Sequence, residues 1–146
     1  MTIDDGFDVD APLERVWALL KDVPRVATCI PNAEITEQVD ERTYRGQVAV
    51  KVGPVAVRYR ATIVIASFDD ANHVATLSVK GDELRGRGGV TATIVSTASE
   101  RDGATHVALH TDAQISGIVA TVGGRLIEGV SRKTIAAFAE NLAKLV

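Results

Sequence analysis

The chain has 146 residues, the size of one ordinary domain, and hydrophobic residues make up 46% of it, as in a soluble globular protein. The formal net charge is only -3 and aromatic residues make up 4%, so neither bulk charge nor base stacking favours nucleic-acid binding. The single cysteine, Cys29, excludes an intramolecular disulfide, and no apolar run approaches the roughly 20 residues that span a bilayer. We therefore expect one cytoplasmic domain over residues 1–146, with peripheral membrane contact left open.

The N-terminal part predicts one strand and two short helices. Residues 3–9 alternate between apolar and polar side chains, as in a strand with one buried face. Asp10 is expected to cap the next helix and Pro12 to occupy its first turn. Apolar residues then recur at helical spacing: Leu13, Val16, Trp17 and Leu20. A second short helix is expected to begin near Pro24.

A long series of strands follows. Tyr44, Val48 and Val50 share one parity, and residues 55–65 alternate clearly after a turn at Gly53-Pro54. Turn residues at 69–72 precede further strands, expected at 74–79, 90–98 and 105–112.

The C-terminal segment changes to helical spacing, with apolar residues from Ile118 to Leu142. Strands followed by one long helix predict an α+β fold, with the helix laid across a curved sheet. Gly123 is expected inside this helix, on the face that meets the sheet, where missing side chains leave room. Close packing without a ligand and a cavity for a small molecule are equally good interpretations of this pattern.

The residues that most often perform chemistry form no catalytic pattern. His106 and His110 share a strand face roughly 13 Å apart, too far to share a metal, and His73 lies at a turn. All three are predicted to be surface histidines, with no metal site. Cys29 is predicted to be a buried thiol. The glycine-rich run 86–89 precedes a strand rather than a helix, so we interpret it as a flexible loop instead of a phosphate cradle.

Four blocks of sequence resemble one known family. They are Phe7, Val9, Ala11-Pro12, Val16-Trp17, Leu20, Asp22, Ala27, Cys29 and Pro31; then Tyr44, Gly46 and residues 50–54; then Gly81, Gly86 and Gly88; and then Thr105, Asp112, Ser116-Gly117, Ala120, Gly123 and Arg125. Together they resemble the G-subunit family of carbon monoxide dehydrogenase, within the START-like helix-grip (SRPBCC) superfamily. The chain departs from the family pattern at Asn32-Ala33, where Gly-Ala usually follows the proline, and at Ala61, where the fourth strand often has a glycine.

The resemblance implies a seven-stranded antiparallel sheet gripping the C-terminal helix around a lipophilic tunnel. It also implies a non-catalytic accessory protein of an aerobic carbon monoxide dehydrogenase, or a related molybdenum hydroxylase, that links the enzyme to the membrane. The C-terminal tail of some family members is expected to be absent, since the sequence ends at Val146. An enzyme of the polyketide cyclase or aromatase type, and a recruitment adaptor with no ligand, stay open as alternatives.

We hypothesise that the ligand is a respiratory quinone, menaquinone or ubiquinone, because the enzyme's electrons must reach the membrane pool. Eighteen residues are expected to line the site: Trp17, Leu20, Val26, Ile30, Tyr44, Val48, Val50, Val57, Tyr59, Ala61, Leu77, Leu84, Ile94, Ile118, Val119, Val122, Gly123 and Leu126. A docking patch for an acidic partner or anionic lipid headgroups is expected at Lys51, Arg58, Arg60, Arg85 and Arg87, although a merely solvated face explains these charges too.

Overall fold

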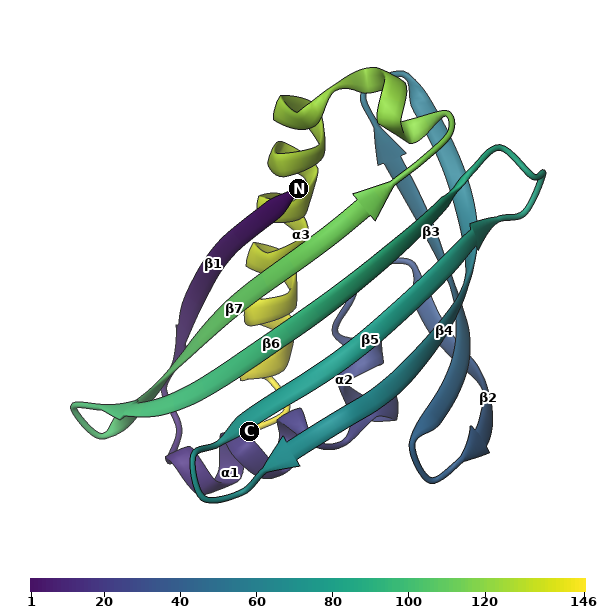
Figure 1. Ribbon diagram of the computed structural model, residues 1–146. Coiled ribbons are helices and arrows are strands. Elements are labelled where there is room, and N and C mark those ends of the chain that lie inside the picture. Colours follow the sequence, from purple (N-terminus) through teal and green to yellow (C-terminus); the bar gives the residue numbers. More distant parts are fainter.

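The computed structural model describes residues 1–146 as one seven-stranded antiparallel sheet with helices on its concave side (Figure 1). The strands are β1 (Thr2–Val9), β2 (Ala33–Asp40), β3 (Thr43–Val52), β4 (Val55–Asp69), β5 (Val74–Glu83), β6 (Gly89–Arg101) and β7 (Ala104–Ile115), in the sheet order β1-β7-β6-β5-β4-β3-β2. The helices are α1 (Leu13–Leu20), α2 (Val23–Thr28), the 3-10 turn η1 (Val119–Val122) and α3 (Gly124–Ala143). The predicted helix-grip fold is confirmed, with two short helices after the first strand and a long C-terminal helix.

Two details at helix ends differ from the sequence-based expectation. Pro12, in an extended conformation, occupies the N-cap of α1, and no side chain caps that helix. Asp10 lies two residues too early, because a capping side chain must stand at the N-cap itself. In α2 the cap is Asp22, whose carboxylate accepts a hydrogen bond from the backbone N–H of Arg25.

The C-terminal helix is shorter than predicted, because the chain breaks at Gly123. This residue has φ +91°, a left-handed conformation that favours glycine, and it separates η1 from α3. Gly123 and Gly117 therefore lie outside the helix. Leu126 lies in the first turn of α3, directly after the break, and is 46% exposed.

The hydrophobic core is divided into two clusters. The first joins β1, α1, β6 and β7 to the C-terminal half of α3, and includes Val16, Val107 and Leu142. The second lies at the β3–β4 hairpin, under η1, and consists of Val52, Val57, Tyr59 and Val119. The strand residues between them face inward but are only half-buried, so the middle of the concave face is not filled.

Trp17 fastens α1 to the β4–β5 turn. Its indole N–H donates to the Asp70 carboxylate at 2.9 Å, and the Lys21 ammonium binds the same oxygen at 2.7 Å. Both hydrogen bonds lower the pKa of Asp70. The indole also packs edge-to-face against Phe68 and His73. Trp17 therefore has a structural role, because it holds α1 against the turn between β4 and β5.

The β5–β6 and β7–η1 loops touch through their backbones. A Cβ atom on Gly117 would lie 1.9 Å from the Arg87 carbonyl oxygen, and one on Gly88 would lie 2.2 Å from that of Ser116. The Ile118 N–H also donates to the Arg87 carbonyl at 2.8 Å. Only glycine allows this approach.

Replacing Gly117 by alanine should therefore destabilise the protein by at least about 3 kcal/mol, because the new methyl group forces two backbones apart. Gly103→Ala is the matched control, since Gly103 has the same φ of +82° but nothing within 4 Å of the added atom. We expect it to cost only about 1 kcal/mol, the conformational penalty alone. Urea unfolding of both variants measures the difference, and equal losses would contradict the contact.

Candidate functional site

An apolar cavity of about 250 Å³ lies on the concave face between α2 and the strands β2 to β6. Its walls are Val23, Val26, Ala27, Ile30, Ala33, Glu34, Ile35, Gly46, Gln47, Val48, Ala61, Ile63, Leu77, Val79 and Ile94. Only two of these side chains are polar, Glu34 and Gln47, and Glu34 is exposed. The cavity is partly open to solvent, and its interior is suited to apolar molecules.

Two small residues, Gly46 and Ala61, make room for this cavity, and the third residue of the same row, Gly81, is covered by Tyr59. Gly46 of β3, Ala61 of β4 and Gly81 of β5 stand side by side across three strands. Gly46 has a second reason to be glycine, because a Cβ there would lie 2.4 Å from the Glu34 carbonyl oxygen of β2. The Tyr59 ring lies over Gly81, with ring and Cβ atoms 3.6 Å from the position of an added methyl. Ala61, one of the two departures from the family pattern, keeps this row small.

Of the residues expected to line a ligand site, the structure brings six together in this cavity: Val26, Ile30, Val48, Ala61, Leu77 and Ile94. Six others belong to the second core cluster or pack against it: Val50, Val57, Tyr59, Ile118, Val119 and Val122. Burial raises the pKa of the Tyr59 hydroxyl.

The remaining six lie elsewhere. Leu20 packs on the first core cluster and Trp17 on the β4–β5 turn. Tyr44 is paired with Ile63 on the inner face but is not part of the wall. Leu84 and Leu126 are exposed, and Gly123 caps α3. The expectation for Leu126 and Gly123 assumes an unbroken helix, but the left-handed Gly123 separates η1 from α3.

The lining residues that sequence reasoning missed come mainly from α2 and β2. Val23, Ala27, Ala33 and Ile35 belong to short elements, whose periodicity is too brief to assign a face. Ile63 and Val79 did carry a signal, since they share the parity of Ala61 and Leu77 on their strands.

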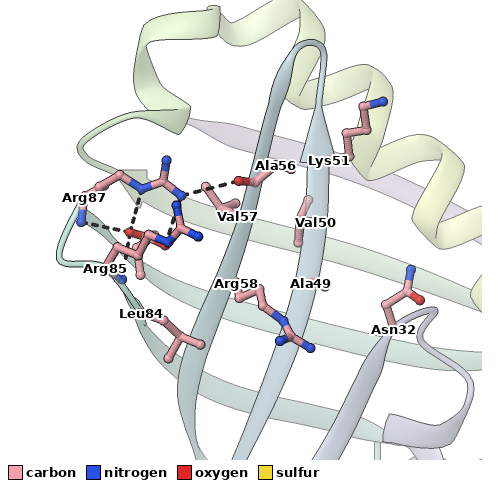
Figure 2. A pocket seen from close by; sticks show the side chains of 11 residues that line it. Asn32, Ala49, Val50, Lys51, Ala56, Val57, Arg58, Leu84, Arg85 and Arg87 are labelled. Carbon is pink, nitrogen blue, oxygen red and sulfur yellow. Dashed lines mark hydrogen bonds and ion pairs between the residues drawn. The ribbon is translucent and has the colours of Figure 1, made fainter.

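A second hollow, of about 800 Å³, lies over the outward-facing side of β3 and β4 beside the β5–β6 loop. We call it the cationic groove, and Figure 2 shows its lining. It is lined by Asn32, Ala49, Val50, Lys51, Ala56, Val57, Arg58, Glu83, Leu84, Arg85 and Arg87. Four of the five residues expected in a docking patch meet here. The fifth, Arg60, lies next along the outer face of β4 from Arg58, opposite Asp82.

Glu83 organises one side of this groove. Its carboxylate accepts hydrogen bonds at 3.0 Å from the backbone N–H groups of Arg85 and Arg87 and from the Arg87 Nε. The Arg87 guanidinium, through Nη2, also donates to the Ala56 carbonyl on β4 at 3.4 Å. These bonds lower the pKa of Glu83, with the Arg87 side chain as the main cause. Lys51, Arg58 and Arg85 have no ion-pair partner, so the groove is strongly positive.

Each histidine pairs with a carboxylate. His106 contacts Asp8 at 2.9 Å, and His110 contacts Asp4, which raises the pKa of His110. His73 contacts Glu14 at 2.8 Å, and its side chain is only 17% exposed because Trp17 covers it. Cys29 is a free, buried thiol, and burial raises its pKa.

The curved sheet, the gripped helix and the apolar cavity define a START-like helix-grip protein. The family model for the G subunit of carbon monoxide dehydrogenase (CoxG) matches residues 6–146, and the chain belongs to this family. No curated protein matches the chain in sequence. None of the helices is long and apolar enough to cross a membrane.

Solved structures show the same fold. A conserved protein from Geobacillus kaustophilus aligns with a TM-score of 0.87 at 24% identity, over 99% of this chain and 93% of that one. The Zhui aromatase/cyclase from Streptomyces sp. R1128 aligns with a TM-score of 0.67 at 17% identity, over 99% and 92%. Norcoclaurine synthase from Thalictrum flavum aligns with a TM-score of 0.66 at 13% identity, over 99% and 85%. At these identities the likeness concerns the fold alone.

The Glu83 carboxylate should make stability depend on pH. Because its folded-state pKa is lowered, its contribution is present above the unfolded value of 4.5 and is lost as the pH falls through the folded value. Glu83→Gln should therefore melt below the wild type at neutral pH, and the gap should close on acidification below about pH 4.5. Melting temperatures across this range test it, with the exposed Glu100→Gln as control. A gap that stays constant with pH would count against the ion pair.

Proposed function

We propose that the protein is a non-catalytic accessory protein of an aerobic carbon monoxide dehydrogenase, or of a related molybdenum hydroxylase. It binds a respiratory quinone, menaquinone or ubiquinone, and links the enzyme to the membrane electron-transport chain. The observation that carries this proposal is the open, apolar cavity between the two halves of the core. Family membership supports the accessory role.

The hydrophobic effect favours a ligand with a long apolar tail, such as a quinone. Each Å² of apolar surface removed from water contributes about 25 cal/mol, so a prenyl tail gains affinity without many polar contacts. The cavity of about 250 Å³ is slightly smaller than most ligand pockets, which measure about 300–1,000 Å³. It is large enough for part of a long molecule, with the rest extending out of its open side.

The composition of the wall favours binding over catalysis. A cyclase or aromatase needs positioned acid, base or hydrogen-bonding groups around its substrate. Here the polar side chains of the wall are Glu34, which is exposed, and Gln47 on the neighbouring strand. This arrangement favours a carrier over an enzyme of the kind found among the fold's relatives.

We further propose that the cationic groove docks an acidic segment on the partner enzyme. Lys51, Arg58 and Arg85 offer three cations without ion-pair partners, and Leu84, which is 40% exposed, offers an apolar contact among them. Arg is enriched at interface centres, and the buried core of an interface is more apolar than the rest of the surface. A hollow receives a protruding protein segment better than a flat bilayer, so we favour the enzyme over anionic lipid as the occupant.

The cavity is tested by ligand binding. We expect solvent extracts of the protein purified from its native host to contain a quinone, and an added quinone to raise the melting temperature, because binding to the folded state stabilises it. Ala61→Phe should abolish this shift, because the ring fills the cavity. Ala66→Phe is the matched control, since the same change lies on an exposed part of the same strand.

An extract without quinone, together with an unchanged melting temperature, would overturn the quinone proposal. If the protein still co-purified with the molybdenum enzyme, that result would favour the adaptor without a ligand.

The groove is tested by charge reversal. Arg58→Glu combined with Arg85→Glu should weaken binding to the purified molybdenum enzyme at least about tenfold, and raising the salt concentration should weaken wild-type binding. The control is Arg132→Glu with Lys133→Glu, which changes the net charge equally on an exposed part of α3. Calorimetric titration at two salt concentrations measures both.

Equal losses in the two double variants would attribute binding to net charge and overturn the docking site. If the variant with Arg58→Glu and Arg85→Glu instead bound the enzyme normally but no longer bound vesicles of anionic phospholipid, the groove would be assigned to the membrane.

A further inference from the structure

No polar side chain faces the interior of the apolar cavity. Glu34 and Gln47 are the polar residues of its wall, and they pair with each other across β2 and β3. Successive side chains of a strand point to opposite faces of the sheet, so Gln47 points outward while its neighbours Gly46 and Val48 face the cavity. The same alternation turns Glu34 outward, and this residue is exposed. Every wall residue that faces the interior is therefore apolar.

The backbone of the sheet does not serve a ligand there either. Strands β3, β4, β5 and β6 each have a neighbouring strand on both sides, so their N–H and carbonyl groups bond within the sheet. β2 is an edge strand, and its unpaired backbone groups point sideways, in the plane of the sheet. The cavity thus binds by removing apolar surface from water, and its walls do not recognise a polar group.

A quinone carries its carbonyl oxygens on the ring and none on the tail. The cavity of about 250 Å³ holds only part of such a molecule, so ring and tail compete for it. Each carbonyl oxygen buried there without a partner would weaken binding about tenfold, because its hydrogen bonds to water are lost and not replaced. A hydrocarbon tail loses no hydrogen bonds, and every two buried methylene groups strengthen binding about tenfold. The tail therefore wins this competition.

We propose that the cavity holds the hydrocarbon tail of the ligand and that the polar ring stays outside it, in contact with water. This inference rests on the proposed function of the cavity and names the part of the ligand that the cavity recognises. Selection then acts on the tail, and the cavity does not distinguish a benzoquinone ring from a naphthoquinone ring. The ring is also accessible to a partner while the tail is still bound.

The experiment separates ring from tail by calorimetric titration. Decylubiquinone and the decyl derivative of menadione carry the same tail on two different rings, and we expect their dissociation constants to agree within about threefold. The same two rings without a tail should bind at least about a hundredfold more weakly. 1-Decanol, a tail without a ring, should displace decylubiquinone. Ala61→Phe should abolish binding of both decyl compounds, whereas Ala66→Phe, at an exposed position of the same strand, should leave it unchanged.

Three outcomes with the wild-type protein would overturn this inference alone, and none depends on the folding of a variant. They are a smaller difference between the tailless rings and the decyl compounds, a larger preference for one ring at equal tail length, and failure of 1-decanol to displace decylubiquinone. If the wild-type protein binds none of these probes, the proposed quinone-binding function of the cavity fails as well.

Discussion

A single helix cannot fill the concave face of a curved seven-stranded sheet, and the position of α3 decides where the unfilled space lies. The helix packs mainly against β1, at one edge of the sheet, and buries only Phe138 and Leu142. One end of the concave face is closed by α1 and the other by η1, each with its own cluster of apolar side chains. The middle, toward β2 and β3, is left to α2, which is too short to cover it.

The same two strands carry both candidate sites. On β3, Val48 lines the cavity and its neighbour Ala49 lines the groove; on β4, Ala61 lines the cavity and Arg58 the groove. Strand alternation accounts for this arrangement, because successive side chains point to opposite faces. A partner in the groove and a ligand in the cavity would therefore contact opposite sides of one thin wall. This arrangement suits the proposed delivery of a ligand to a partner enzyme.

Fold and function are separate matters here. The same architecture occurs in an aromatase/cyclase and in norcoclaurine synthase, so the helix-grip fold is compatible with catalysis. What distinguishes sites on a shared scaffold is the chemistry of the wall. In this chain the wall consists mainly of small and branched apolar residues, and its polar side chains are Glu34 and Gln47.

β2 was implied only by the family resemblance, but the sequence predicted the other six strands and the helices in their order, because alternation in residues 55–65 and helical spacing near the C-terminus are local patterns. It also determined that Arg58 and Arg60 face outward and that Ala61 faces inward. The folded structure was needed to show that the helix is broken at the left-handed Gly123 and that Leu126, just after it, is exposed. It also decided that Leu84 and Arg85 lie beside Lys51 and that Trp17 binds Asp70. These contacts join segments far apart in the chain, and their geometry follows from the curvature of the sheet, which no local pattern specifies.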